Sequence, residues 1–240
     1  MNSYFDEFKK LMPHTSQIVA ATSTELLGSL SKLEIRSNLS ELVQTLHDDV
    51  YENYKKSQSQ IGESLILSKL ERGELTFELL DKFFVSLGNS RKSRAGTTFE
   101  LILKELFQTY LGYPLDSQVQ IDGAKPDFVL PSAKRFIDNP LDCILLTAKR
   151  TLRERWRQVI TEANKSYLYF LAHLDDNVSQ NQINEAQKHK VYLVTTSEII
   201  ERVGHYQRST NVISFEDFLD RHLDPAMKRW GLSGHLEEYS

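Results

Sequence analysis

Apolar residues at Leu42, Val43, Leu46 and Val50 recur every three or four positions, which is the spacing of an amphipathic helix. Ser40 has the side chain of an N-cap residue, and the apolar pattern follows it directly. The same pattern covers residues 76–87 and ends at Gly88-Asn89-Ser90, which predicts a turn. We therefore expect a mostly helical N-terminal subdomain, residues 1–90, and a second domain, residues 91–240.

The second domain has a different pattern, in which short β-permissive runs alternate with amphipathic stretches. Its first element is a strongly amphipathic helix, Thr97–Leu111. Strands are expected at 119–121, 128–130, 143–148, 167–174, 191–195 and near 212–213, and helices at 151–165, 180–189, 197–202 and 215–223. Alternating strands and helices predict an α/β domain with a mixed sheet, and such sheets usually place their chemistry at strand ends.

Composition excludes several classes of protein. The chain has 240 residues, of which 40% are hydrophobic and 26% are charged, as in an ordinary globular protein with a sizeable core. Its apolar runs, such as Cys143–Leu146, are far shorter than the roughly 20 residues that span a bilayer. No secretory signal is visible at the N-terminus, and a single cysteine cannot form an internal disulfide, so a cytoplasmic location is expected.

The most informative stretch is Pro126-Asp127, followed by apolar β-formers and, 22 positions after Asp127, by Lys149 at the end of a buried strand. Hydrolysis of a phosphodiester needs carboxylates to hold Mg²⁺, and a nearby lysine can orient the attacking water or stabilise developing charge. This arrangement resembles the PD-(D/E)xK nuclease pattern.

One position departs from that pattern. An acid is expected two residues before the lysine, but the residue there is Thr147, which cannot replace an anionic metal ligand. Either the site is inactive, or another carboxylate supplies the charge. Glu162, thirteen residues after Lys149, lies on the polar stripe of a predicted helix and is the candidate.

Further residues make the resemblance specific. Arg91–Gly96, Phe99-Glu100, Lys149–Gln158 and Glu162-Ala163 occur in one order along the chain. Over roughly residues 90–225 the sequence resembles the catalytic domain of the EcoRII/SsoII/PspGI group of Type II restriction endonucleases. In that group the second acid is displaced from the strand onto the following helix, which accounts for Thr147.

The resemblance implies both a fold and a site. The expected fold is a restriction-endonuclease-like α/β core, with a mixed central sheet flanked by helices and a mostly helical N-terminal part that supports DNA binding or dimerisation. Asp127 and Glu162 would be the ligands of Mg²⁺, and Lys149 would be the catalytic lysine. Glu100 would be the additional acid that supports the metal or its water.

The resemblance also implies a double-stranded DNA target. The segment Arg153-Glu154-Arg155, here called the recognition segment, would read cytosine–guanine pairs, since Arg can bridge guanine O6 and N7 and Glu can accept from a cytosine amino group. Arg91, Lys92 and Arg94 would contact phosphates. Members of the group recognise short palindromes with a CC/GG core, and a palindrome read by one segment implies a homodimer.

Simpler interpretations stay open at this point. The recognition segment could be a solvated helix face, Arg91–Arg94 an ordinary basic loop, and Glu100 an acid favoured by a helix N-terminus. Tyr51 and Tyr54 are better explained by helix packing than by base stacking. A repair-type or nicking nuclease, or a DNA-binding module that does not cut, would also be compatible with the same core.

The distribution of charge is compatible with a DNA-binding enzyme. The net charge of −4 excludes a protein that binds nucleic acid through bulk charge. However, Arg91–Gly96 carries +3 and Lys149–Arg157 carries +4, which leaves −11 for the rest of the chain. Positive charge is therefore concentrated in the two segments that would contact DNA.

Overall fold

The computed structural model of the chain describes residues 4–119, 125–152 and 169–232. Their α-carbon contacts divide the chain into two compact units. The helical unit consists of residues 1–28 and 46–102, and the sheet unit consists of residues 29–45 and 103–240. Within the described residues no helix is long and apolar enough to cross a membrane.

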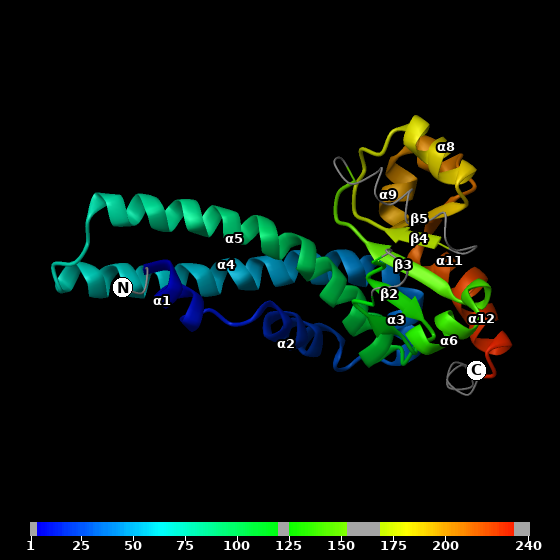
Figure 1. Cartoon of the computed structure of the whole chain (residues 1–240), viewed down its shortest axis with the longest axis horizontal. Coiled ribbons are helices and arrows are strands. Elements are labelled where there is room, and N and C mark those ends of the chain that lie inside the picture. The colour runs from blue at the N-terminus through cyan, green and yellow to red at the C-terminus, as the bar shows by residue number, and fades with distance from the viewer. Residues whose placement is uncertain (1–3, 120–124, 153–168, 233–240) are drawn as a thin grey trace. The chain divides into compact units, whose positions relative to one another are not determined.

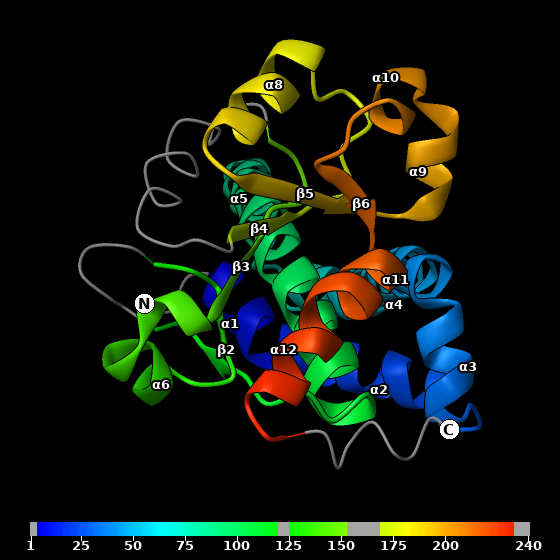
Figure 2. The ribbon, with the colours of Figure 1, turned by 90° about the vertical axis from the view of Figure 1, so that its right-hand side faces the viewer.

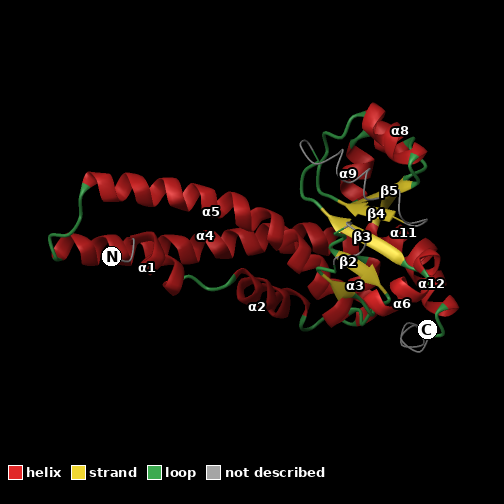
Figure 3. Ribbon diagram, viewed as in Figure 1, coloured by secondary structure: helices red, strands yellow, loops and turns green. Residues whose placement is uncertain are grey.

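Two long helices form a hairpin in the helical unit (Figures 1 and 3). The unit contains α1 (Tyr4–Leu11), α2 (Thr15–Leu27), most of α4 (Leu39–Glu71) and most of α5 (Phe77–Lys104). Gly73 takes a φ of 68° in the turn between α4 and α5, a conformation that costs glycine little. Buried Tyr4 and Phe8 pack on Phe83 of α5, with ring centroids 4.8 and 5.3 Å away.

The turn predicted at Gly88-Asn89-Ser90 is wrong, because α5 runs without a break from Phe77 to Lys104. Glycine in a helix interior costs about 1 kcal/mol relative to alanine. Burial of Leu87 and Phe99 on either side of the glycine stabilises the helix by more than that. A Cβ at Gly88 would meet no atom within 4 Å, so close packing does not require glycine there.

The sheet unit has a six-stranded sheet in the order β1-β2-β3-β4-β5-β6. The first two pairings are antiparallel and the next three are parallel, so the predicted mixed sheet is confirmed. The strands are β1 (Asp116–Ser117), β2 (Phe128–Leu130), β3 (Ile144–Ala148), β4 (Tyr169–Ala172), β5 (Val191–Thr195) and β6 (Val212–Ser214). The α-helices are α3 (Lys32–Ser37), α6 (Ala133–Asp138), α8 (Gln180–Lys188), α9 (Ser197–Arg202), α10 (Gly204–Gln207), α11 (Phe215–Phe218) and α12 (Asp224–Arg229), with π-helical turns at Glu105–Tyr110 and Leu219–Leu223 and a 3₁₀ turn at Pro140–Asp142.

Helices cover both faces of this sheet (Figure 2). On one face, Leu145 and Leu171 pack with Ile183 of α8 and Ile199 of α9 in a single buried cluster. On the opposite face, Phe170 packs edge-on against Phe218 at 4.8 Å. Helices on both faces of a mostly parallel sheet are the arrangement that the alternating sequence pattern predicted, and the fold class is confirmed.

Three local predictions need comment. The first described strand is Asp116–Ser117, so Val119 lies outside it, and Ile121 lies outside the described residues, as does most of the helix predicted at 151–165. Ser40 is not an N-cap, because α4 already begins at Leu39. Instead, the Glu216 carboxylate accepts hydrogen bonds from Ser40 N and Oγ, both at 2.6 Å, and satisfies an amide of the first turn.

Candidate active site

Asp127 is brought to the site by the antiparallel pairing of β2 and β3. Phe128 lies opposite Leu146, so the next step in the register places Asp127 opposite Thr147, on the same face of the sheet. Asp127 is 7% exposed, and its Oδ2 accepts hydrogen bonds from Ala148 N and from Lys149 Nζ, both at 2.8 Å. The carboxylate is therefore fixed by the strand that carries the lysine.

Lys149 is the first residue after β3, and its main chain continues the ladder. Lys149 N donates to Ala172 O at 2.9 Å, so the parallel pairing with β4 extends one residue beyond the strand. The side chains of Lys149 and Asp127 are 17% and 10% exposed, so the ion pair is mostly buried but reaches solvent. The structure thus brings together two predicted site residues that are separated by 22 positions.

Thr147 occupies the position at which the nuclease pattern expects an acid. Its hydroxyl is buried and lies 2.8 Å from the hydroxyl of Tyr169 on β4, within hydrogen-bonding distance. A side chain that is neutral and already bonded to Tyr169 cannot supply the charge of a second carboxylate. Glu162, which the sequence predicts as the displaced acid, and the recognition segment, Arg153 to Arg155, lie outside the described residues.

The groups around Asp127 fit a hard divalent cation as far as they are described. Within the described part of the chain, both hydrogen bonds to the Asp127 carboxylate use Oδ2, so Oδ1 is the oxygen that can face a cation, and oxygen ligands suit Mg²⁺. Among residues 4–119, 125–152 and 169–232, no three His, Cys, Asp or Glu side chains are grouped closely enough to hold a metal. Glu162, the second carboxylate expected from the sequence, lies outside those ranges.

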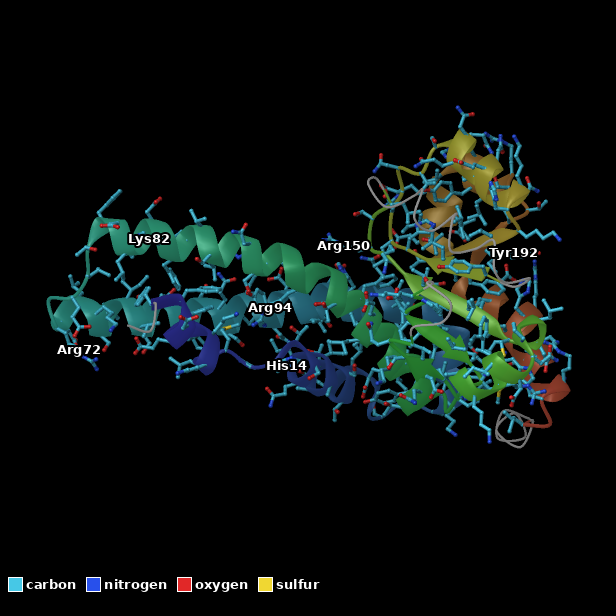
Figure 4. The ribbon with its side chains drawn as sticks, in the orientation of Figure 1. His14, Arg72, Lys82, Arg94, Arg150 and Tyr192 are labelled. Atoms are coloured by element: carbon cyan, nitrogen blue, oxygen red, sulfur yellow. The ribbon has the colours of Figure 1, made fainter. Side chains whose placement is uncertain are left out.

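The remaining predicted site residues lie in α5 of the helical unit. Glu100 is partly buried there, and Arg91, Lys92 and Arg94 belong to the same helix rather than to a loop. Arg91 Nε donates to Gln58 Oε1 at 2.9 Å. Arg94, labelled in Figure 4, lies over the ring of Tyr54 with its guanidinium carbon 5.1 Å from the centroid. Arg94 therefore makes a cation–π contact within its own unit.

Three residues near Lys149 were not predicted. Arg150 is exposed directly after the lysine and is labelled in Figure 4. His173 follows β4, and in the parallel register of β3 and β4 it lies beside Lys149. Asp175 accepts a hydrogen bond from Leu152 N at 2.9 Å. Arg150 extends a basic run that was visible in the sequence, whereas no sequence signal distinguishes His173 or Asp175 from the other histidines and aspartates.

His173 is fully buried, and burial lowers the pKa of its imidazole to about 4, although Asp175 opposes the shift. Asp175 N donates to His173 Nδ1 at 3.1 Å, so the neutral ring carries its proton on Nε2. Among the described residues Nε2 has no hydrogen-bond partner. At neutral pH the ring is therefore uncharged and serves as an acceptor for the turn after β4.

This burial predicts a dependence of stability on pH. The pKa of His173 is about 4 in the folded state and about 6.5 in the unfolded state, so the unfolded chain binds the proton first as the pH falls. Stability should be fully present above pH 6.5 and fall by up to about 3 kcal/mol as the pH drops to 4. Urea unfolding of wild type and His173→Asn between pH 4 and 7.5 measures the effect.

The asparagine at position 173 keeps an acceptor for Asp175 N but has no imidazole that can bind a proton. The variant should therefore lose less stability than wild type between pH 6.5 and 4. His222, whose pKa burial also lowers, contributes in the same direction in both proteins. Parallel stability curves for the two proteins would contradict the assignment to His173.

Comparison with known sequences places this site in a family. Residues 59–219 match the family described as EcoRII C terminal. The Type II restriction enzyme SsoII of Shigella sonnei is 36% identical over 150 residues, which are 58% of this chain and 48% of that enzyme. The Type II restriction enzyme EcoRII of Escherichia coli is 34% identical over 146 residues, 58% of this chain and 35% of that enzyme. The chain thus matches about half or less of the length of these relatives.

Solved structures agree with the fold. Metal-depleted Ecl18kI in complex with uncleaved, modified DNA has a TM-score of 0.79 and 25% identity, and the match covers 95% of this chain and 83% of that one. The PspGI–substrate DNA complex has a TM-score of 0.71 and 21% identity, and the match covers 92% of this chain and 96% of that one. The family match extends over more than half of the residues and includes both Asp127 and Lys149. The chain belongs to the EcoRII C-terminal family.

Proposed function

We propose that this protein is a Type II restriction endonuclease, which hydrolyses double-stranded DNA at a short palindrome with a CC/GG core, depends on Mg²⁺ and acts as a cytoplasmic homodimer. The observation that carries the proposal is the contact of 2.8 Å between Asp127 and Lys149, at the ends of neighbouring strands in a chain of this family. A carboxylate and a lysine so placed suit hydrolysis of a phosphodiester.

The chain's own residues would have separate roles in the reaction. Asp127 and Glu162 would hold the metal, which supplies Lewis acidity to the scissile phosphate when bound, and Glu100 would support the metal or its water. Lys149 would orient the attacking water and stabilise the charge that develops on the phosphate oxygens. Because its ammonium group is already held by Asp127, little reorganisation is needed when the substrate arrives.

Recognition would come from the residues after the lysine. Arg153-Glu154-Arg155 offers a donor, an acceptor and a donor to neighbouring G·C pairs. Exposed Arg150, together with Arg91, Lys92 and Arg94, would contact phosphates and so contribute affinity without base specificity. One such segment per chain reads half of a palindrome, which is the reason for proposing two copies.

Digestion of plasmid DNA tests the proposal. The purified protein should convert plasmid and phage DNA into discrete fragments when Mg²⁺ is present, and EDTA should stop the reaction. Sequencing of the fragment ends should give cuts in both strands at one site with CC and GG halves. Light scattering should give a mass of two chains.

The alternatives give different results in the same experiment. A smear of fragments, or preferential cutting of mismatched DNA, would identify a repair-type nuclease, and cuts in one strand only would identify a nicking enzyme. A specific gel shift without cleavage under any divalent metal would identify a binding module. Each of these results would overturn the restriction assignment.

A further inference from the structure

The turn that follows β4 is built from buried hydrogen bonds. Asp175 N donates to His173 Nδ1, and Tyr206 OH donates to Asp175 O at 2.8 Å. The same Tyr206 hydroxyl accepts from Val178 N at 2.9 Å, so one side chain closes both ends of the turn. His173, Asp175 and Tyr206 are all at least nine-tenths buried. The turn is therefore rigidly connected to the core of the sheet unit.

This turn presents one carboxylate to the chain that leaves β3. Asp175 Oδ1 accepts from Asn177 N at 3.0 Å within the turn, and Oδ2 accepts from Leu152 N at 2.9 Å. Between the two strand exits, Lys149 N donates to Ala172 O at 2.9 Å and Leu174 N to Arg150 O at 3.3 Å. The Asp175 carboxylate thus continues the connection between these two segments where the β3–β4 ladder of main-chain bonds ends.

A buried carboxylate is a costly acceptor for one amide unless its charge is well compensated. At Asp175 two main-chain N–H groups supply that compensation, and bonds of this kind are stronger than neutral ones. Leu152 itself is 1% exposed and belongs to the core cluster of the sheet. The chain is therefore fixed both by a charge-assisted hydrogen bond and by packing, at the residue directly before Arg153.

We propose that Asp175 is a positioning residue for DNA recognition, which fixes Leu152 and thereby sets where the recognition segment begins relative to Lys149. The inference rests on the proposed function, because the recognition segment reads bases only in a site-specific nuclease. Lys149 is held independently through Asp127 and Ala172, so loss of Asp175 should affect discrimination between sites more than the cleavage step.

Two variants and two controls test the proposal. Asp175→Ala removes both acceptors, and Asp175→Asn keeps one oxygen acceptor and the shape of the side chain. Asp176→Ala changes the neighbouring, exposed aspartate, which pairs with Arg202 at 3.0 Å. Glu216→Ala removes a carboxylate that also accepts from a main-chain amide of another element, Ser40 N, and that follows β6, two strands along the sheet from β4. Glu216→Ala thus controls for the loss of stability that follows when a hydrogen bond from a main-chain amide to a carboxylate is removed.

Discrimination is measured as the ratio of cleavage rates at the cognate site and at sites with one substituted base pair. Asp175→Ala should lower this ratio at least tenfold, and Asp175→Asn should recover part of it. Both controls should keep the ratio of wild type, even where Glu216→Ala lowers Tm as much as Asp175→Ala does. An unchanged ratio in Asp175→Ala, or an equal loss in Glu216→Ala, would overturn the proposal.

Amide hydrogen exchange of Leu152 separates this inference from the proposed function. In Asp175→Ala the exchange should be at least tenfold faster than in wild type, whereas Asp176→Ala should leave it unchanged. If wild type cuts no DNA but Leu152 exchange responds as expected, the proposed function fails, and only the fixing of Leu152 by Asp175 is supported. If wild type cuts DNA specifically and Leu152 exchange does not respond to Asp175→Ala, the proposed role of Asp175 fails and the proposed function stands. Asp175→Asn provides the folded variant if the alanine variant does not fold.

Discussion

Replacing Lys149 by alanine is expected to lower the rate of DNA cleavage by about 10²- to 10³-fold, the effect of removing one preorganised group that stabilises transition-state charge. The ammonium group lies 2.8 Å from Asp127 Oδ2. Asp127 keeps its hydrogen bond from Ala148 N in the variant, so the carboxylate stays in place. Single-turnover cleavage with Mg²⁺ and excess enzyme measures the loss.

Lys188→Ala is the matched control, because it removes the same charge from an exposed position in α8. This control should cleave at the rate of wild type, and both variants should bind the cognate site in Ca²⁺ with wild-type specificity. If Lys149→Ala retained cleavage within twofold of wild type, the assignment of Lys149 as the catalytic lysine would be withdrawn.

Replacing Glu162 by glutamine is expected to reduce cleavage at least a hundredfold, whereas Thr147→Val should leave the cleavage rate nearly unchanged. The first substitution removes an anionic ligand proposed for Mg²⁺, and a neutral amide binds this cation weakly. The second removes a hydroxyl that lies within hydrogen-bonding distance of Tyr169 OH. It should cost about 1–3 kcal/mol of stability, because a buried hydrogen bond is lost. Cleavage rates over a Mg²⁺ titration, together with urea unfolding, measure both effects.

The two substitutions decide which position supplies the second acid. For Glu162→Gln the loss of cleavage rate should be largest at low Mg²⁺, and the rate should partly recover at high concentrations of Mg²⁺ or Mn²⁺. The opposite pattern, with Thr147→Val folded but inactive and Glu162→Gln active, would place the missing ligand near β3 and contradict a displaced acid.

Elements whose signal is local were predicted well from the sequence. The strand Val191–Thr195 and the helix Ser197–Arg202 agree with the structure at both ends. Each is a short run whose burial pattern and capping are contained in its own residues; Thr196, for example, caps the helix through Ile199 N. The apolar run that ends before Lys149 predicted β3 for the same reason.

Where tertiary packing competed with local signals, the predictions failed. Gly88-Asn89-Ser90 has the composition of a turn, yet it lies inside α5, because neighbouring turns of that helix bury Leu87 and Phe99. Ser40 has the side chain of an N-cap residue, but it lies inside α4, and Glu216, which is 176 positions away, accepts a hydrogen bond from its amide. In both cases residues distant in sequence or along the helix outweighed a local preference of about 1 kcal/mol.

The sequence by itself determined the family resemblance, the alternation of strands and helices, and the position of Lys149 at the end of a buried strand. It also showed that Thr147 cannot supply the charge of an anionic metal ligand, because that conclusion needs only the chemistry of one side chain. These features depend on residue type and on spacing within one element.

Only the tertiary structure decided which side chains meet. The contact of Asp127 with Lys149 depends on the antiparallel register of β2 and β3, since a shift of one residue would turn Asp127 to the other face. The bond from Leu152 to Asp175 depends on the parallel pairing of β3 with β4 and on a turn held by Tyr206. Contacts between residues 22 or 23 positions apart are set by strand pairing and core packing, which are properties of the whole sheet and not of any single segment.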